Sequence, residues 1–169
     1  MKNQKGFSLI ELLIVVVIIG IIAAIAIPNL LAARRAANEG SAISATRTLH
    51  GAQFTYAATY GNGQYAGTNT VGVGTTDVVA LTQLGVQGLV DATLTTGTKS
   101  GYSFFGGRSD STATAPAQFC FSAIPVGTTG VVATGTRRFG INTDGVIKAE
   151  TTPLTHYANI AGVLAAPAL

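Results

Sequence analysis

A long stretch without charge constrains this chain more than any other feature. Residues 12–27 form an unbroken run of sixteen apolar residues, glycine included; Glu11 stands directly before it, and the next charged residue is Arg34. Extended through Leu31, the run reaches about twenty residues, enough for one helix to cross a hydrocarbon core of roughly 30 Å. A charge buried among apolar groups is costly unless it is paired, so the single acid at the edge of this run requires an explanation.

Three interpretations of this segment compete. A cleaved secretory signal is supported by Lys2 and Lys5 and by the small residues at positions 24 and 26. Against it, the apolar run is at the long end for such a signal, and Glu11 lies within its start. A plain membrane anchor accommodates the length but gives no reason for the acid, because an acid within a membrane span is expensive and usually functional. The third interpretation is a specialised, processed segment.

The order of residues at the start of the chain resembles that of a type IV prepilin. The sequence KGFSLIELLIV at residues 5–15 is followed by IAIPN at residues 25–29. The likeness covers residues 1 to about 35 and is specific in its order: a short basic leader that ends in glycine, then Phe7, then an acid as the fifth residue after the leader.

The resemblance implies that residues 1–6 are a class III signal peptide. In that family a membrane-embedded peptidase cuts after the glycine on the cytoplasmic side and methylates the new terminal amine. Carried over to this sequence, the cut falls between Gly6 and Phe7, and Phe7 becomes the methylated first residue. Pro28 matches a proline of the family, and we expect the helix to bend there.

The chemistry of such a cut gives Glu11 a role. Cutting after Gly6 creates an ammonium on Phe7, which can offset the Glu11 carboxylate on the same helix or on a neighbouring one. Within one chain such a pair contributes only about 0.2–0.5 kcal/mol in water, so the larger effect is the penalty for leaving either charge unpaired where water is scarce. Glu11 is therefore predicted to set the register between helices during assembly, as single polar residues do in coiled coils. The alternative is a glutamate that only reaches the membrane interface.

One helix is predicted from about Phe7 to Tyr60, roughly 80 Å long at 1.5 Å per residue. Past Pro28 the residues still favour helix, and Gly61-Asn62-Gly63 supplies the stop. Residues at spacings of three and four form one face of the second half of this helix, and the resemblance implies that this half packs on the head; they are Ala42, Ala45, Leu49, Ala52 and Tyr56.

The chain accordingly divides into four segments. They are the leader at 1–6, a hydrophobic half-helix at 7–33 that crosses the membrane or packs in a filament core, an amphipathic half-helix at 34–60, and a head at 61–169. The resemblance implies a pilin fold, in which a long helical spine packs on the head.

The head is predicted to hold a small antiparallel sheet. A loop rich in Gly, Thr and Asn is expected over residues 61–74, followed by a short helix at 77–85 with Asp77 as its N-cap. Strands are expected at residues 102–105, 118–124, 137–141 and 146–150, and a tight turn at 142–145 joins the last two into a hairpin. Strands that follow a long helix indicate an α+β fold.

Charge and cysteine content argue against a nucleic-acid site and against an intramolecular disulfide. Ten basic and seven acidic side chains give a charge of +3, and removing the leader with Lys2 and Lys5 leaves +1. The remaining cations are scattered, so the sequence predicts no nucleic-acid site. The single cysteine, Cys120, cannot form an intramolecular disulfide and is expected to be a buried structural thiol.

No catalytic group or cofactor site is expected. His50 and His156 have no evident carboxylate or thiol partner at useful spacing, and Asp144 lacks the neighbouring acids of a calcium loop. The stretch at residues 97–100 does not have the order of a phosphate-binding loop. The chain is predicted to be neither an enzyme nor a metal or cofactor protein.

The resemblance implies a structural subunit of a type IV pilus. Its expected partners are copies of itself, a prepilin peptidase and methylase, and an inner-membrane assembly platform driven by a separate ATPase. The precursor would sit in the inner membrane by a single span, and the mature chain in a filament on the cell surface. A pseudopilin of a type II secretion or competence system is the alternative, and a membrane-anchored binding domain is a weaker one.

Overall fold

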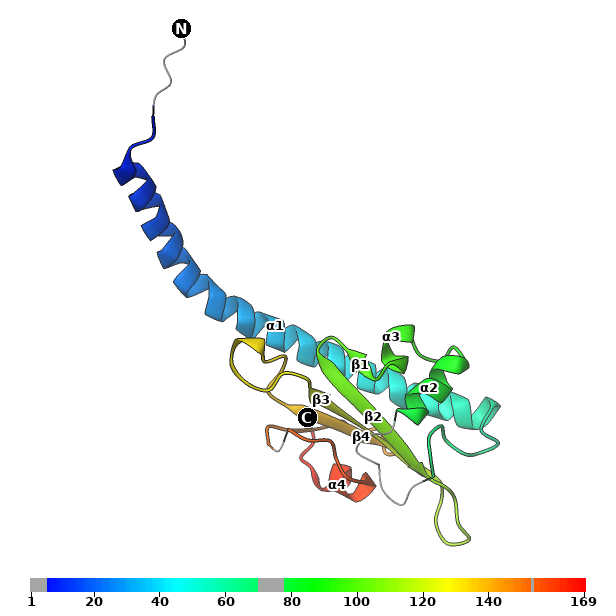
Figure 1. Ribbon diagram of the computed structural model, residues 1–169. Coiled ribbons are helices and arrows are strands. Elements are labelled where there is room, and N and C mark those ends of the chain that lie inside the picture. Colours follow the sequence, from blue (N-terminus) through cyan, green and yellow to red (C-terminus); the bar gives the residue numbers. More distant parts are fainter. Residues whose placement is uncertain (1–5, 70–77, 153) are drawn as a thin grey trace. The chain divides into compact units, whose positions relative to one another are not determined.

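The computed structural model describes residues 6–69, 78–152 and 154–169 (Figure 1). The chain forms two compact units, Met1–Arg34 and Arg35–Leu169, and one helix, α1 (Leu9–Thr59), runs from the first into the second. The predicted helix from Phe7 to Tyr60 is thus confirmed to within two residues at each end.

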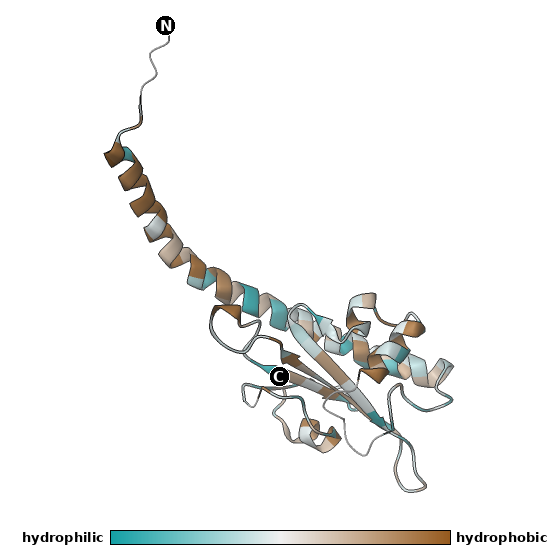
Figure 2. Cartoon of the chain, viewed as in Figure 1, coloured by the Kyte–Doolittle hydropathy of each residue, from teal (hydrophilic) through white to brown (hydrophobic). Residues whose placement is uncertain are grey.

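The first unit consists of the apolar part of α1. Large apolar side chains from Leu9 to Leu30 are at least half exposed, and Figure 2 shows this part of the helix as almost uniformly hydrophobic. The helix continues through Pro28, although proline cannot donate to the carbonyl four residues earlier. None of the described residues of this unit, 6–34, is buried, so its large apolar surface is not covered by the unit itself.

The second unit is built on the other half of α1. The face predicted from the sequence is buried: Ala42, Ala45, Leu49 and Ala52 are each no more than 6% exposed. Three of these four residues are alanines, whose small side chains let the helix approach the head closely. Tyr56 is partly buried and packs against the same core.

The head contains a five-stranded antiparallel sheet in which each strand pairs with the next along the chain. The strands are β1 (Thr98–Lys99), β2 (Tyr102–Ser109), β3 (Gln118–Pro125), β4 (Arg138–Asn142) and β5 (Lys148–Glu150). The α+β fold and the last four strands are confirmed, with bounds that differ at their ends. The predicted last strand began two residues too early, at Val146, and β1 was not predicted.

The hairpin of β4 and β5 follows the predicted turn. The Gly145 N–H donates to the Asn142 carbonyl at 3.0 Å, and Gly145 has a φ of +77°, a conformation that glycine adopts without steric cost. In β2, Gly106 has a different reason: a Cβ there would lie 2.2 Å from the Phe121 ring. Glycine at this position leaves the space that the Phe121 ring occupies.

Two short helices precede the sheet, α2 (Val79–Val86) and α3 (Ala92–Thr95). The first confirms the expected short helix, but its N-cap position is Val78, without a side-chain cap; Asp77 lies outside the described residues. The second was not predicted. It is capped by Asp91, whose carboxylate accepts from the Leu94 N–H at 2.9 Å, and hydrogen bonds from Lys99, Thr93 and Leu94 hold the pKa of Asp91 far below its usual value.

The two faces of the sheet are covered by different parts of the chain. In β3, Phe119 and Phe121 belong to the core shared with α1 and α2, whereas Cys120 packs with Tyr157 and Val163 of the C-terminal segment. Because both faces are covered, six of the eight residues of β3 are buried. Figure 1 shows α4 (Ile160–Ala165) on the opposite side of the sheet from α1.

The C-terminal segment, which the sequence left unplaced, adds to the edge of the sheet. The Ala149 N–H donates to the Pro167 carbonyl at 3.0 Å and the Leu169 N–H to the Ile147 carbonyl at 2.9 Å. These bonds pair the tail with β5 and with Ile147 just before it. The edge strand of the hairpin therefore does not offer free backbone groups for pairing with another chain.

The head is tied to α1 by polar groups that we call the helix–loop latch: Arg35, Asn38 and Glu39 on the helix, with residues 130–137 of the head. The Glu39 carboxylate accepts from the Thr136 N–H at 2.7 Å and from Arg137 Nε at 2.9 Å. Burial alone would raise the pKa of Glu39, but the hydrogen bonds and the Arg137 charge outweigh it and lower the pKa.

A second tie is the fully buried Gln53. Its amide bonds both backbone groups of one residue: Nε2 donates to the Ala66 carbonyl at 2.9 Å, and Oε1 accepts from the Ala66 N–H at 2.7 Å. The Gln53 side chain thereby makes the two hydrogen bonds that a neighbouring strand would otherwise make with Ala66. It holds the backbone in place shortly after the end of α1.

We expect Gln53→Leu to destabilise the fold by about 1–3 kcal/mol, because both backbone groups of Ala66 would be buried without a partner. Urea unfolding of the full chain in detergent micelles measures this. Gln87→Leu is the matched control, since Gln87 is exposed, and should change stability by less than about 0.5 kcal/mol. Equal effects of the two substitutions would contradict the role given to Gln53.

Candidate processing and assembly site

The Gly6–Phe7 peptide bond lies before the first helical residue. Residues 6–8 have no helix or strand structure, and the Phe7 side chain is 84% exposed. A peptidase requires an extended and accessible chain around the bond that it cuts. The bond predicted to be cleaved is accessible and lies outside helix and strand.

Glu11 takes part in the start of α1. Its Oε2 accepts from the backbone N–H of Ser8 at 3.0 Å, and since α1 begins at Leu9, Ser8 is the N-cap and Glu11 the third helical residue. This is the glutamate half of a capping box, which satisfies an N–H that helix geometry leaves unpaired. In the uncut chain Glu11 therefore has a local partner.

The role of Ser8 was missed in the sequence, although the signal was present. Ser-x-x-Glu directly before an apolar run is the signature of a capping box, and residues 8–11 read SLIE. An acid near a helix N-terminus is also favoured by the helix dipole. The acid thus helps to begin the helix, in addition to any role between helices.

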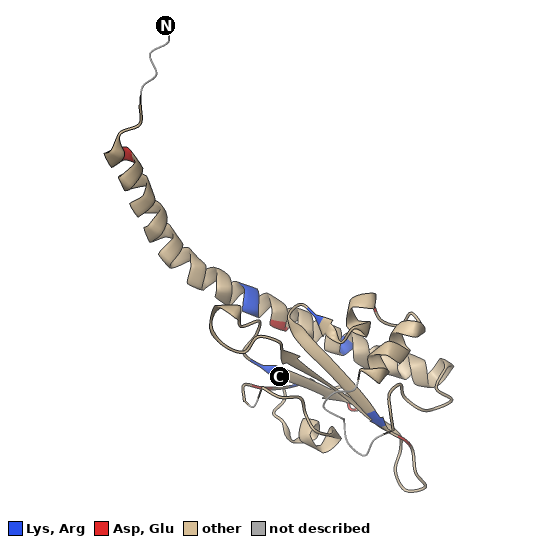
Figure 3. Cartoon of the chain, in the orientation of Figure 1, with Lys and Arg blue, Asp and Glu red and all other residues tan. Residues whose placement is uncertain are grey.

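The apolar segment between the charges is long enough to span a membrane. In the sequence Glu11 stands at one end of this segment and the adjacent Arg34 and Arg35 stand at the other. Figure 3 shows the helix between its acidic and basic positions without a charged residue. By length and composition, α1 is the one helix in the described residues that could cross a bilayer, although a signal sequence passes the same test.

The other candidate residues have structural surroundings. The Cys120 thiol is buried, as predicted, and burial raises its pKa to about 12. The His50 ring lies against Phe54 and Phe119, with centroids 5.0 and 5.5 Å away. Asp144 accepts from Asn142 Nδ2 at 3.2 Å. No group of three or more metal-binding side chains occurs within residues 6–69, 78–152 and 154–169.

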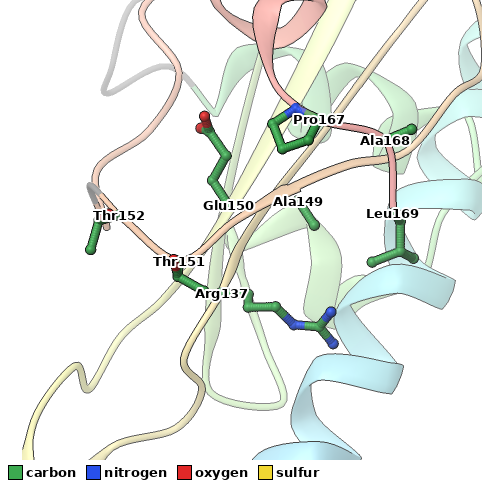
Figure 4. Close-up of a pocket in the computed structure, with 8 residues that line it drawn as sticks. All are labelled: Arg137, Ala149, Glu150, Thr151, Thr152, Pro167, Ala168 and Leu169. Atoms are coloured by element: carbon green, nitrogen blue, oxygen red, sulfur yellow. The ribbon is translucent and has the colours of Figure 1, made fainter.

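A pocket of about 450 Å³ lies beside the C-terminus, between the hairpin and the tail (Figure 4). Its one cation, Arg137, already pairs with Glu39 at 2.9 Å, and Glu150 pairs with Arg138. The charged groups of the pocket are thus occupied by structural partners.

His156 is the buried histidine of the tail. Its Nδ1 lies 3.0 Å from Ser122 Oγ, and its ring stacks on Phe105 with centroids 4.0 Å apart. Its Nε2 is buried and has no hydrogen-bond partner in the described part of the chain. Burial lowers the pKa of His156 to about 4, so the ring is neutral in the folded state near neutral pH.

The comparisons with known proteins concern the same N-terminal segment. A family described as "Prokaryotic N-terminal methylation motif" matches residues 1–27. The type IV wide pilus major component PilA4 of Thermus thermophilus is 69% identical over 39 residues, which are 23% of this chain and 30% of that protein. A fimbrial protein of Pseudomonas aeruginosa is 79% identical over 29 residues, 17% of this chain and 19% of that one.

Secretion proteins match as well. The type II secretion system core protein G of Klebsiella pneumoniae is 36% identical over 52 residues, 31% of this chain and 37% of that protein. The matches therefore span about a third or less of the length of these curated relatives, and no solved structure gives a significant match. A long N-terminal apolar helix on an α+β head, with these matches, makes the chain similar to type IV pilins and pseudopilins over its N-terminal segment.

Acidification should destabilise the head through His156. A histidine whose folded pKa lies below its unfolded value of 6.5 stabilises the fold fully above pH 6.5, and this stability is lost as pH falls toward the folded pKa of about 4. We expect a loss of about 2 kcal/mol between pH 6.5 and 4.5, measured by urea unfolding at each pH. His156→Asn keeps a polar partner for Ser122 and should abolish most of the slope; an unchanged slope would contradict the assignment.

Proposed function

We propose that this chain is a structural subunit of a type IV pilus. A precursor held in the inner membrane by α1 is cut between Gly6 and Phe7, methylated on Phe7, and polymerised into a helical filament of identical copies on the cell surface. The observation that carries the proposal is the start of α1, which is charge-free from Leu12 to Ala33 and has its large apolar side chains up to Leu30 at least half exposed. It lies in the stretch that matches an N-terminal methylation motif and is similar to PilA4 and the fimbrial protein.

Burial of the apolar half-helix at residues 7–33 supplies the cohesion of such a filament. At about 25 cal/mol per Å² of apolar surface, a few hundred Å² per helix stabilises the assembly by on the order of 10 kcal/mol before entropy losses. The bilayer covers the same surface in the precursor, so extraction needs outside work. We assign that work to a separate ATPase on an inner-membrane assembly platform.

Glu11 has two tasks in this proposal. Before the cut it accepts from the Ser8 N–H and begins the helix. After the cut the Phe7 ammonium is available as a partner, on the same chain or on a neighbour, and an unpaired Glu11 in the filament core would oppose assembly. Pro28 is proposed as the point at which the helix bends when copies pack together.

A pseudopilin of a type II secretion system is the second candidate, favoured by the match to core protein G. One feature of the head argues against the pseudopilin. The chain has no tryptophan, so it lacks a stretch of the Asp-Pro-Trp-Gly type, which is expected in the major secretion pseudopilin. Electron microscopy of filaments sheared from cells, with mass spectrometry, tests the choice. Long surface filaments of this chain favour the pilus, and their absence favours the pseudopilin. Adhesion, twitching motility and DNA uptake belong to the whole machine.

The proposed cut predicts a defined N-terminus. Mass spectrometry of the mature chain should find N-methylated phenylalanine at residue 7. Gly6→Val should leave the precursor uncut and in the membrane fraction, because a side chain is introduced next to the scissile bond, whereas Asn3→Val within the leader is the control. A mature chain that begins at Ile27 would instead indicate a secretory signal.

Substitutions at Glu11 separate its two tasks. Glutamine can replace glutamate in a capping box but carries no charge, so Glu11→Gln should retain the helix start and cleavage yet reduce filament yield about as strongly as Glu11→Ala. Filaments are quantified by shearing and electron microscopy, and Asp144→Ala, at an exposed acid of the head, is the control. Normal filaments from Glu11→Gln would mean that capping alone explains the acid.

A further inference from the structure

An uncharged loop lies at the end of the head from which α1 emerges. Residues 126–136 read VGTTGVVATGT, without a single charged side chain, and form the yellow loop beside the start of the head's part of α1 in Figure 1. Val131 and Val132 at its tip are each 71% exposed. Adjacent valines this exposed suggest a surface that something outside the head covers.

The loop is held in a fixed shape by its own residues. The Thr134 N–H donates to the Gly127 carbonyl at 2.8 Å, and the Gly127 N–H donates to Thr134 Oγ1 at 3.1 Å. Thr134 Oγ1 also donates to the Gly101 carbonyl at 2.6 Å, which fastens the neck of the loop to the sheet. The valines are therefore presented outward by a closed and anchored turn.

The helix–loop latch fixes the position of this loop along α1. Arg35 Nη2 donates to the Gly130 carbonyl at 2.8 Å, and Asn38 Nδ2 donates to the Thr134 carbonyl at 2.9 Å. Arg35 follows Ala33, the last residue of the apolar segment, by two positions, or about 3 Å of helix axis. The tip of the loop is thus attached to the helix where the apolar segment ends.

The charges around the loop suit a lipid surface. Arg34 is exposed and stands at the end of the apolar segment, where a cation meets headgroup phosphates favourably. The nearest acid of the latch, Glu39, is buried and occupied by Thr136 and Arg137. The tip is uncharged and apolar and is bonded to Arg35, the residue that follows the exposed Arg34 in the sequence, and the latch acid is already paired. This is the composition of an interfacial membrane contact.

We propose that Val131 and Val132 contact the lipid bilayer in the membrane-anchored precursor, so that the head rests on the membrane through this loop until the chain is extracted. The inference rests on the anchored precursor of the proposed function. Two valines and one arginine form a small, reversible contact, which adds orientation of the head to the anchorage that the span already provides. Extraction must break this contact before the loop becomes available to neighbouring subunits.

The test places an environment-sensitive fluorophore on the loop. The full-length precursor with Val131→Cys, labelled with NBD, is inserted into nanodiscs of phosphatidylethanolamine and phosphatidylglycerol at one chain per disc, so that no second copy can cover the loop. Cys120 is buried, and the unsubstituted chain measures its background labelling. Val86→Cys is the matched control, because Val86 is 76% exposed and α2 lies toward the other end of the head (Figure 1).

We expect the label at residue 131 to show a blue-shifted emission and a loss of intensity with lipids that carry a quencher near the headgroup, and the label at residue 86 to show neither. Arg34→Gln together with Val132→Asn should shift the emission back toward that of water. Equal, water-like emission from both labels would overturn the proposal. So would a blue shift that arises only with several chains per disc, because the loop would then be covered by a second copy.

The same preparation distinguishes failure of this inference from failure of the proposed function. Co-elution of the chain with the discs tests the anchored precursor by itself. A chain that co-elutes but carries a water-exposed loop contradicts only the loop contact. A chain that does not enter the discs contradicts the anchored precursor, and the loop contact with it.

Discussion

The constraint on which this molecule depends is the apolar surface of the first half of α1. Residues 9–30 expose large aliphatic side chains along the whole of their length, and water around such a surface is unfavourable in proportion to its area. None of the described residues of the first unit, 6–34, is buried. In the proposed function this surface is covered first by a bilayer and then by other copies of the same helix, and a sequence without charge between Glu11 and Arg34 suits both.

The head has a different requirement. It must fold on the second half of α1, while the first half of the same helix exposes its apolar side chains. Small residues let α1 lie close to the sheet, and polar groups at both ends of the contact satisfy the backbone of the head: Glu39 at one end and Gln53 at the other. These bonds fix the position of the head along the helix. A force applied to α1 is transmitted to the head through paired polar groups as well as through apolar packing.

The elements with local signals could be predicted from the sequence, and those made by distant contacts could not. The helix, its buried face and the β4–β5 turn follow from spacing, glycine and β propensity within a few residues. The Glu39–Arg137 pair joins residues 98 positions apart, and α4 is placed by a sheet face that is apparent only once β3 is paired. Nothing in the sequence of the tail predicts this packing. Tyr157 and Val163 lie far from Cys120 along the chain, and helical or strand periodicity relates only residues that are close in sequence.

The capping bond refines the question that Glu11 raises. Capping is local and uses one oxygen, Oε2, to accept from the Ser8 N–H, and the proposed cut before Phe7 would leave that N–H in place. A carboxylate can accept further hydrogen bonds at its other oxygen, so the new ammonium of Phe7 need not displace the cap. An acid held in place by Ser8 loses less side-chain entropy when it pairs with an amine than a free one does. The capping bond thereby holds the carboxylate at the start of the helix, which is where the proposed register role requires it.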